Sequence, residues 1–197
     1  ADLAKLHSAP DGTPWAPIVG LGLQGPEAEF PPEPFEAAFD IARAAGLMSI
    51  PHAGEHLGPE SVWTAISKLG AKRLAHGVRA VEDPELVAKL AELKVCCDVC
   101  PSSNVLLNVT PSLKTHPMLA LMKAGVPVSI NADDPLLFKS VGVLDEFRSM
   151  RGELAMDDIQ LAELATNSLI YAACPDQDLI KDCLKGVEAW LAAEPKP

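Results

Sequence analysis

Short apolar runs alternate along the chain with amphipathic stretches of helical length, and this alternation restricts the fold more than any other feature. The apolar runs begin roughly 22 to 33 residues apart and predict strands at 18–23, 47–53, 73–76, 95–99 and 126–131. Helical patterns occupy 34–45, 58–69, 83–93, 117–124, 143–150 and 158–173. Repeated β/α units of this kind are typical of a parallel sheet covered by helices. We therefore expect an α/β fold.

Unusual polar residues follow the end of each predicted strand. In chain order these segments are Gly22 to Glu27, His52 to Glu55, His76, Cys100 to Asn104, and Asp133 with Asp134. Loops that leave the carboxyl ends of parallel strands converge at one edge of the sheet, where ligand sites form. The sequence therefore predicts a functional site made from these segments.

Imidazole and carboxylate groups dominate these strand ends, and both are ligands of zinc. A catalytic zinc site needs about three or four such ligands and an open position for water. Neighbouring residues of an extended chain point to opposite sides, so Asp133 and Asp134 can serve different partners. Taken singly, His76 is also compatible with a structural role, and either aspartate with a solvated turn capped by Pro135.

Composition excludes several classes of protein. The chain of 197 residues is 48% hydrophobic, which is typical of a globular domain. Its formal net charge of -11 opposes a nucleic-acid partner, which requires clustered Lys and Arg. No apolar run approaches the length needed to cross a bilayer, and we expect no membrane partner and a cytoplasmic location. The odd number of cysteines, five, favours reduced thiols.

Five motifs together resemble the adenosine deaminase family, whose members are zinc-dependent purine nucleoside deaminases. The motifs are His52-Ala53-Gly54-Glu55, Ala75-His76-Gly77, Cys100-Pro101-Ser102-Ser103-Asn104, His116-Pro117 and Asn131-Ala132-Asp133-Asp134-Pro135. The resemblance implies a (β/α)8 TIM barrel. Residues 1–197 would supply roughly its C-terminal five β/α units, as part of a single barrel domain.

The resemblance also implies a catalytic role for four of these residues. His52 and Asp133 would be ligands of one Zn2+ ion. Glu55 would protonate N1 of the purine ring, and His76 would orient and deprotonate the attacking water. Ring protonation at neutral pH requires a carboxyl group whose pKa is raised, as burial in an apolar pocket would do.

The same resemblance places two residues at the substrate. Asp134 would hold purine N7, and the backbone N–H of Gly25 would reach N3. Adenosine, converted to inosine and ammonia, is the first substrate that it implies. Relatives that act on adenine, aminodeoxyfutalosine or N6-modified adenylates share these motifs, so deamination of those compounds is the alternative.

The paired histidines of the family's first strand, His-x-His, are not found in this chain. We therefore expect the zinc site to be completed by an N-terminal half of the same barrel. A half-barrel by itself would expose its sheet edges, which favours self-association. A further hypothesis is a catalytically silent fragment that binds purines or serves in assembly.

Three other interpretations of the motifs fit the sequence less well. Cys97-x-x-Cys100 has the spacing of a redox or structural zinc motif, but it lies in an apolar run that favours packed thiols. A cytidine deaminase would need His-x-Glu and Pro-Cys-x-x-Cys, which do not match. An amidohydrolase acting on a cyclic amide is opposed by Asp134 and Gly25, the implied purine contacts.

Overall fold

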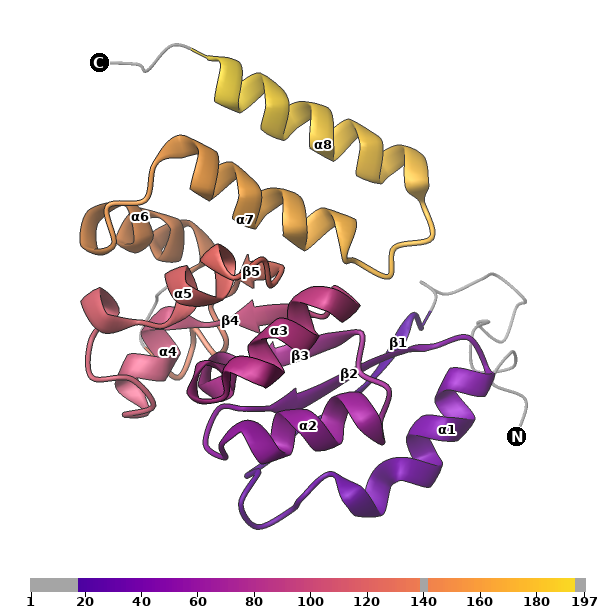
Figure 1. Ribbon diagram of the computed structural model, residues 1–197. Coiled ribbons are helices and arrows are strands. Elements are labelled where there is room, and N and C mark those ends of the chain that lie inside the picture. Colours follow the sequence, from indigo (N-terminus) through magenta and orange to yellow (C-terminus); the bar gives the residue numbers. More distant parts are fainter. Residues whose placement is uncertain (1–17, 139–141, 194–197) are drawn as a thin grey trace.

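A single parallel sheet forms the centre of the protein in a computed structural model that describes residues 18–138 and 142–193 (Figure 1). Its strands are β1 (Gly20–Leu23), β2 (Met48–Ala53), β3 (Arg73–His76), β4 (Cys96–Val99) and β5 (Val128–Ile130). All five predicted strands are present, although β1 and β5 are shorter than their apolar runs.

The strands lie side by side in chain order, from β1 to β5. In an open doubly wound sheet the strand order reverses at a switch point, whereas strands of a barrel follow one another in sequence. The register aligns residues of four strands in one row: His52 lies beside Ala75, Ala75 beside Asp98, and Asp98 beside Ser129. The described sheet therefore has the order of consecutive β/α-barrel units.

Helices connect the strands and extend beyond the last one. They are α1 (Glu36–Ala44), α2 (Pro59–Ser67), α3 (Pro84–Leu93), α4 (Pro101–Leu106), α5 (Met118–Lys123), α6 (Val143–Glu153), α7 (Asp158–Ile170) and α8 (Gln177–Ala192). The short 3-10 helices within residues 18–138 and 142–193 are η2 (Glu33–Phe35), η3 (Val78–Glu82) and η4 (Leu113–Thr115). The Asp83 side chain accepts hydrogen bonds from the backbone N–H groups of Glu85 and Leu86 and so caps the N-terminus of α3.

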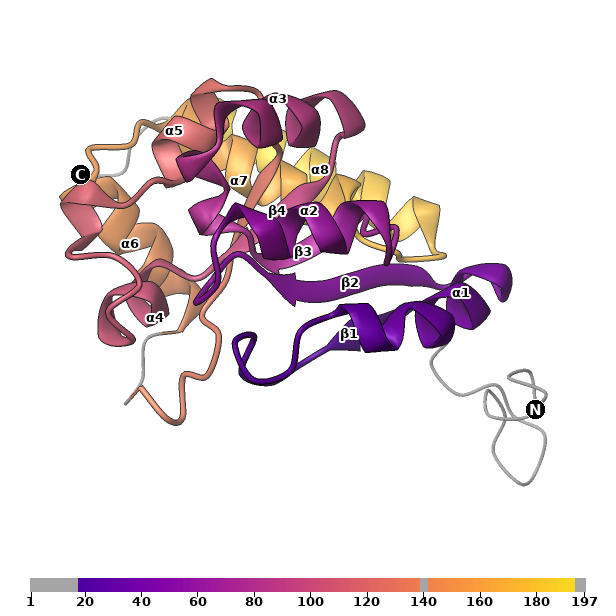
Figure 2. The same ribbon diagram turned by 60° about the horizontal axis from the view of Figure 1, so that its bottom comes forward.

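One face of the sheet packs against the helices and forms the core. Leu74, Cys97 and Val128 point to this face and are fully buried. They join buried side chains of α2, α3, α5, α6 and α7 in one continuous cluster. Figure 2 shows α2 and α3 on the same side of β2 and β3. This packing holds the strands in register and so positions their carboxyl ends.

The opposite face of the sheet is only partly covered, and it carries polar side chains. Arg73 Nε lies 2.7 Å from both carboxylate oxygens of Asp98, and Ser129 Oγ donates to Asp98 Oδ1 at 2.6 Å. The side chains of Arg73 and Asp98 are 13% and 18% exposed. Each charge on this face is therefore neutralised by a close partner.

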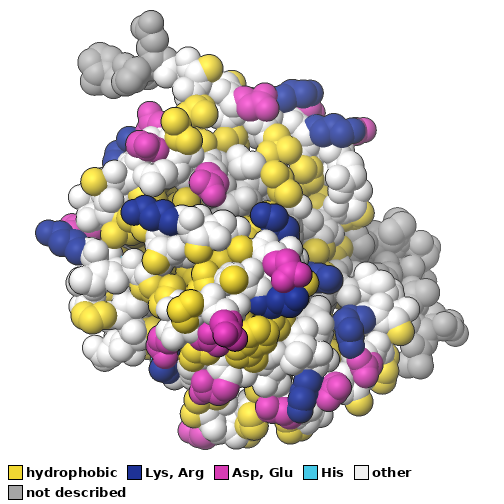
Figure 3. Space-filling model, in the orientation of Figure 1, with side chains coloured by type: hydrophobic (Ala, Val, Ile, Leu, Met, Phe, Trp, Pro, Cys, Tyr) yellow, Lys and Arg dark blue, Asp and Glu magenta, His cyan; other side chains and the backbone are white. Residues whose placement is uncertain are grey.

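Charges of both signs are mixed on the surface shown in Figure 3. Lys and Arg side chains lie there beside Asp and Glu, with apolar side chains between them. This face has no concentrated basic patch of the kind that contacts phosphates. Among the described residues, no helix combines the length and the apolar character that a membrane span requires.

The assignment of the core predicts different losses of stability for two leucine substitutions. Leu74→Ala should lower the free energy of unfolding by about 2–5 kcal/mol, because Leu74 is fully buried and its truncation leaves a cavity. Leu93→Ala, at a position 43% exposed, should change it by less than about 0.5 kcal/mol. Urea unfolding followed by circular dichroism measures both. Equal losses would contradict this assignment of the core.

Candidate active site

The ends of β2 and β3 bring three predicted site residues into contact. His52 and His76 have ring centroids 4.9 Å apart, in an edge-on arrangement. Glu55, in the loop after β2, places Oε2 3.4 Å from His76 Nε2. Glu55 and His76 are both buried. The parallel register therefore assembles two imidazoles and one carboxyl group, as the sequence predicts.

Two candidate site residues have left-handed backbones. The φ angle is 72° at His76 and 55° at Asp133, a region that residues with a Cβ rarely adopt. Gly54, between His52 and Glu55, also has φ of 72°, and a Cβ there would lie 2.5 Å from Val62 Cγ2. Strained conformations of this kind concentrate at functional sites. The sharp turns direct the side chains toward the end of the sheet.

Glu55 has the environment of a protonated carboxyl group. Burial raises its pKa from 4.5 to about 7, and the negative charges of Asp133 and Glu27 act in the same direction. A hydrogen bond from Asn104 Nδ2 to Glu55 Oε1, at 3.4 Å, opposes this shift. A group with this pKa exchanges a proton near neutral pH, which is the requirement for a general acid.

The pKa of His76 is shifted in the opposite direction from that of Glu55. Burial and the neighbouring His52 lower the pKa of His76 from 6.5 to about 4. The imidazole is therefore neutral at pH 7. A neutral ring offers one donor and one acceptor nitrogen.

Glu27 holds the loop that carries Glu55, a role that the sequence analysis did not assign. Its Oε1 accepts a hydrogen bond from the backbone N–H of Glu55 at 3.2 Å, and its Oε2 accepts one from Leu57 at 2.7 Å. Glu27 is 6% exposed. The sequence indicated a role for Glu27 only through its position in the polar segment after the first strand.

The short helix α4, which follows β4, contacts two candidate site residues. The sequence analysis identified a motif in this segment but predicted no helix there. Ser103 Oγ donates to Asp133 Oδ2 at 2.7 Å, and Asn104 contacts Glu55. Both α4 side chains are fully buried. Adjacent residues of one rigid turn therefore restrain two candidate site carboxylates.

The donor atoms of the site suit a metal ion. His76, Cys100 and Asp133 each offer a ligand atom, and these atoms lie within 4.8 Å of one another. His52 Nδ1 is buried and has no hydrogen-bond partner among the described residues. A buried polar atom without a partner is costly unless a ligand satisfies it. Nitrogen, oxygen and sulfur donors are those that zinc accepts, so this set fits zinc.

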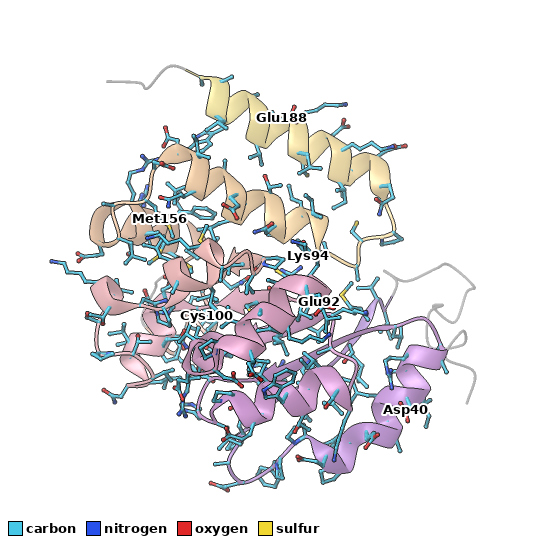
Figure 4. All side chains as sticks on the ribbon, in the orientation of Figure 1. Asp40, Glu92, Lys94, Cys100, Met156 and Glu188 are labelled. Carbon is cyan, nitrogen blue, oxygen red and sulfur yellow. The ribbon has the colours of Figure 1, made fainter. Side chains whose placement is uncertain are left out.

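Cys100 is an unforeseen member of this donor group. The residue, labelled in Figure 4, follows β4 and is buried. The sequence interpretation of Cys97 and Cys100 as packed thiols agrees with their burial and with the free state of all five cysteines. Burial raises the pKa of the Cys100 thiol well above its ordinary value, which keeps it protonated.

The two residues that the sequence predicts to bind substrate, Gly25 and Asp134, are exposed. Gly25, with φ of 126°, is exposed and lines the same small hollow as His52. Asp134 is exposed, and its backbone oxygen accepts from Phe138 at 3.0 Å. The side chain of His56 is 46% exposed, and its Nε2 lies 3.7 Å from Glu55 Oε2.

Comparisons with known proteins identify the family of the chain. The family description "Adenosine deaminase" matches residues 13–190. The aminodeoxyfutalosine deaminase of Streptomyces coelicolor is 40% identical over 179 residues, which are 89% of this chain and 46% of that protein.

Two crystal structures are also similar. The adenine deaminase of Arthrobacter aurescens is 35% identical with a TM-score of 0.85, and the match covers 90% of this chain and 54% of the other. A zinc-bound amidohydrolase from Burkholderia ambifaria is 28% identical with a TM-score of 0.78, covering 98% and 54%. The chain thus spans about half the length of the relatives it matches. The motifs, the strand order and the match over residues 13–190 together show that the chain belongs to the adenosine deaminase family.

Proposed function

We propose that the protein acts in the hydrolytic deamination of a 6-aminopurine, within a site that this chain shares with further barrel strands. The observation that carries the proposal is the buried Glu55 carboxyl group, with a pKa of about 7, in contact with the neutral His76 ring. The names of its relatives favour adenine or aminodeoxyfutalosine beside adenosine, the first substrate implied by the motifs.

The residues of the chain divide the chemistry among them. Water adds its oxygen to C6 of the purine with one proton, and its other proton replaces the one that N1 receives. The C6–N bond then breaks, the amino group leaves as ammonia with the remaining hydroxyl proton, and a C6–O double bond is left. Glu55 supplies the proton that N1 gains as the ring is attacked, and His76 orients the attacking water. Asp134 and the Gly25 N–H hold N7 and N3 of the ring.

His52 and Asp133 would hold the metal ion. Cys100 lies near Asp133, and its thiol would have to lose its proton before it could bind the metal. A zinc ion held there would supply Lewis acidity, which makes water a stronger nucleophile at neutral pH. Ser103 restrains Asp133 through its hydroxyl at 2.7 Å. The pair of histidines expected from the family's first strand would complete the ligand set.

Glu55→Gln tests the proposed reaction. In the intact protein supplied with Zn2+, it should lower kcat about 10²- to 10⁴-fold, because the amide cannot donate the proton. Glu92→Gln, an exposed carboxyl on α3, is the matched control and should retain full activity. The change in ultraviolet absorbance of adenine, adenosine and aminodeoxyfutalosine measures turnover. Full activity of Glu55→Gln would exclude the proposed mechanism.

His52→Ala tests the proposed metal ligand. The substitution should weaken zinc retention at least about 10-fold, since the loss of even an outer-shell partner has effects of this size. His56→Ala removes the neighbouring exposed imidazole and should have little effect. Metal content after dialysis against graded chelator concentrations gives the comparison. Equal loss in both variants would assign the ligand role to His56 as well.

The raised pKa of Glu55 predicts a pH-dependent stability. Between pH 4.5 and about 7 the folded chain holds the Glu55 proton that the unfolded chain releases, so this group's contribution to stability falls as pH rises. Above about pH 7 Glu55 is ionised in both states, and its unfavourable contribution to the free energy of unfolding no longer changes with pH. Glu55→Gln removes it and should raise Tm more at pH 8 than at pH 4.5, with chelator present.

Thermal unfolding followed by circular dichroism at both values of pH measures this difference. Glu92→Gln again serves as the control, because Glu92 is exposed and its change in Tm should not depend on the Glu55 titration. The same Tm change for Glu55→Gln at pH 4.5 and pH 8 would show that Glu55 ionises normally in the folded chain.

A further inference from the structure

A second layer of buried polar side chains lies behind Glu55 and His76. Asn104 is fully buried in α4, and His116, just before α5, is 4% exposed. His116 Nε2 lies 3.2 Å from Asn104 Oδ1. Asn104 Nδ2 lies 3.4 Å from Glu55 Oε1 and 3.5 Å from His76 Nδ1. These contacts form a continuous path from a loop to the candidate site.

The direction of every hydrogen bond in this path follows from one backbone group. The N–H of Met118, which can only donate, lies 3.2 Å from His116 Nδ1. His116 Nδ1 is therefore the acceptor, and the proton of the neutral ring resides on Nε2. Burial lowers the pKa of His116 to about 4, so the ring is neutral at pH 7. His116 Nε2–H then donates to Asn104 Oδ1.

The Asn104 amide transmits this orientation. With Oδ1 directed at His116, its NH2 group faces Glu55 and His76. An amide nitrogen donates and does not accept, so His76 Nδ1 must be an acceptor. The neutral His76 ring then carries its proton on Nε2, 3.4 Å from Glu55 Oε2.

The geometry points to His116 and Asn104 as positioning residues that hold His76 in its Nε2–H tautomer. The orientation of a catalytic imidazole by hydrogen bonds to its other nitrogen is a general requirement of such sites. This inference rests on the proposed function for its catalytic meaning. It supports the orienting half of the role expected of His76, in which Nε2–H is directed at an oxygen. It leaves His76 without a free lone pair for a proton or a metal ion until Asn104 moves, so the metal ligands of this chain would be His52 and Asp133 and not His76.

The tautomer can be measured without metal, substrate or turnover. The 197-residue chain, labelled with 15N in its histidine rings, is examined by NMR at pH 7.5 with chelator, and couplings between ring nitrogens and carbon-bound protons identify the protonated nitrogen. His76→Gln assigns the His76 signals by their loss. The expected result is a single Nε2–H tautomer at His76. An Nδ1–H tautomer in the unsubstituted chain would overturn the inference, whatever the outcome of the activity assay.

Substitutions then test each link of the path. His116→Gln keeps a nitrogen donor for Asn104 Oδ1 and should preserve the Nε2–H tautomer, whereas His116→Leu should produce a mixture of both tautomers. Asn104→Asp places an oxygen acceptor opposite His76 Nδ1 and should favour the Nδ1–H form. The exposed His56 ring should be unchanged throughout, as an internal control.

The amide spectrum of each variant reports whether it is folded. If His116→Leu does not fold, the comparison of His116→Gln with Asn104→Asp decides the matter, because both retain polar groups of similar size. An unchanged Nε2–H tautomer in folded Asn104→Asp would remove Asn104 from the path. A mixture in folded His116→Gln, equal to that in His116→Leu, would show that donation from residue 116 is not what orients the amide.

Discussion

Burial of one sheet face against the helices is the constraint on which the rest of the structure depends. Leu74 alternates with Arg73 along β3, and Cys97 alternates with Asp98 along β4, so core packing determines which side chains face the opposite side. A shift of one residue would exchange these sets and bury the Arg73–Asp98 pair. The same register places His52, His76 and the residues after β4 and β5 at one edge.

At that edge the low polarity of the surroundings and the local hydrogen bonds act in opposite directions on Glu55. Burial and two neighbouring carboxylates favour the neutral acid, whereas the Asn104 amide favours the anion. The balance raises the pKa of Glu55 to about 7. A carboxyl group with a pKa in this range can donate a proton to a ring nitrogen at neutral pH and take it back. The arrangement thus links the packing of the core to the acidity of one side chain.

Much of this could be predicted from the sequence, because it depends on local patterns. The five strands, the Asp83 cap and the polar strand ends all follow from periodicity or from neighbouring residues. The partners of Glu55 could not be predicted in the same way. Glu27 and Asn104 are 28 and 49 residues away from it, and only the folded chain shows that they point toward it. Helix α4 was not predicted, because it begins with a proline and three polar residues, Pro101 to Asn104, a composition that also favours turns.

The left-handed backbones at His76 and Asp133 place local strain where the proposed chemistry requires particular side chains. A glycine at either position would relieve that strain and remove the functional group in the same step. Variants selected only for resistance to heat should therefore collect glycine, or asparagine in the case of Asp133, at these two sites. Substitutions that raise stability would then remove the proposed functional groups at the same positions.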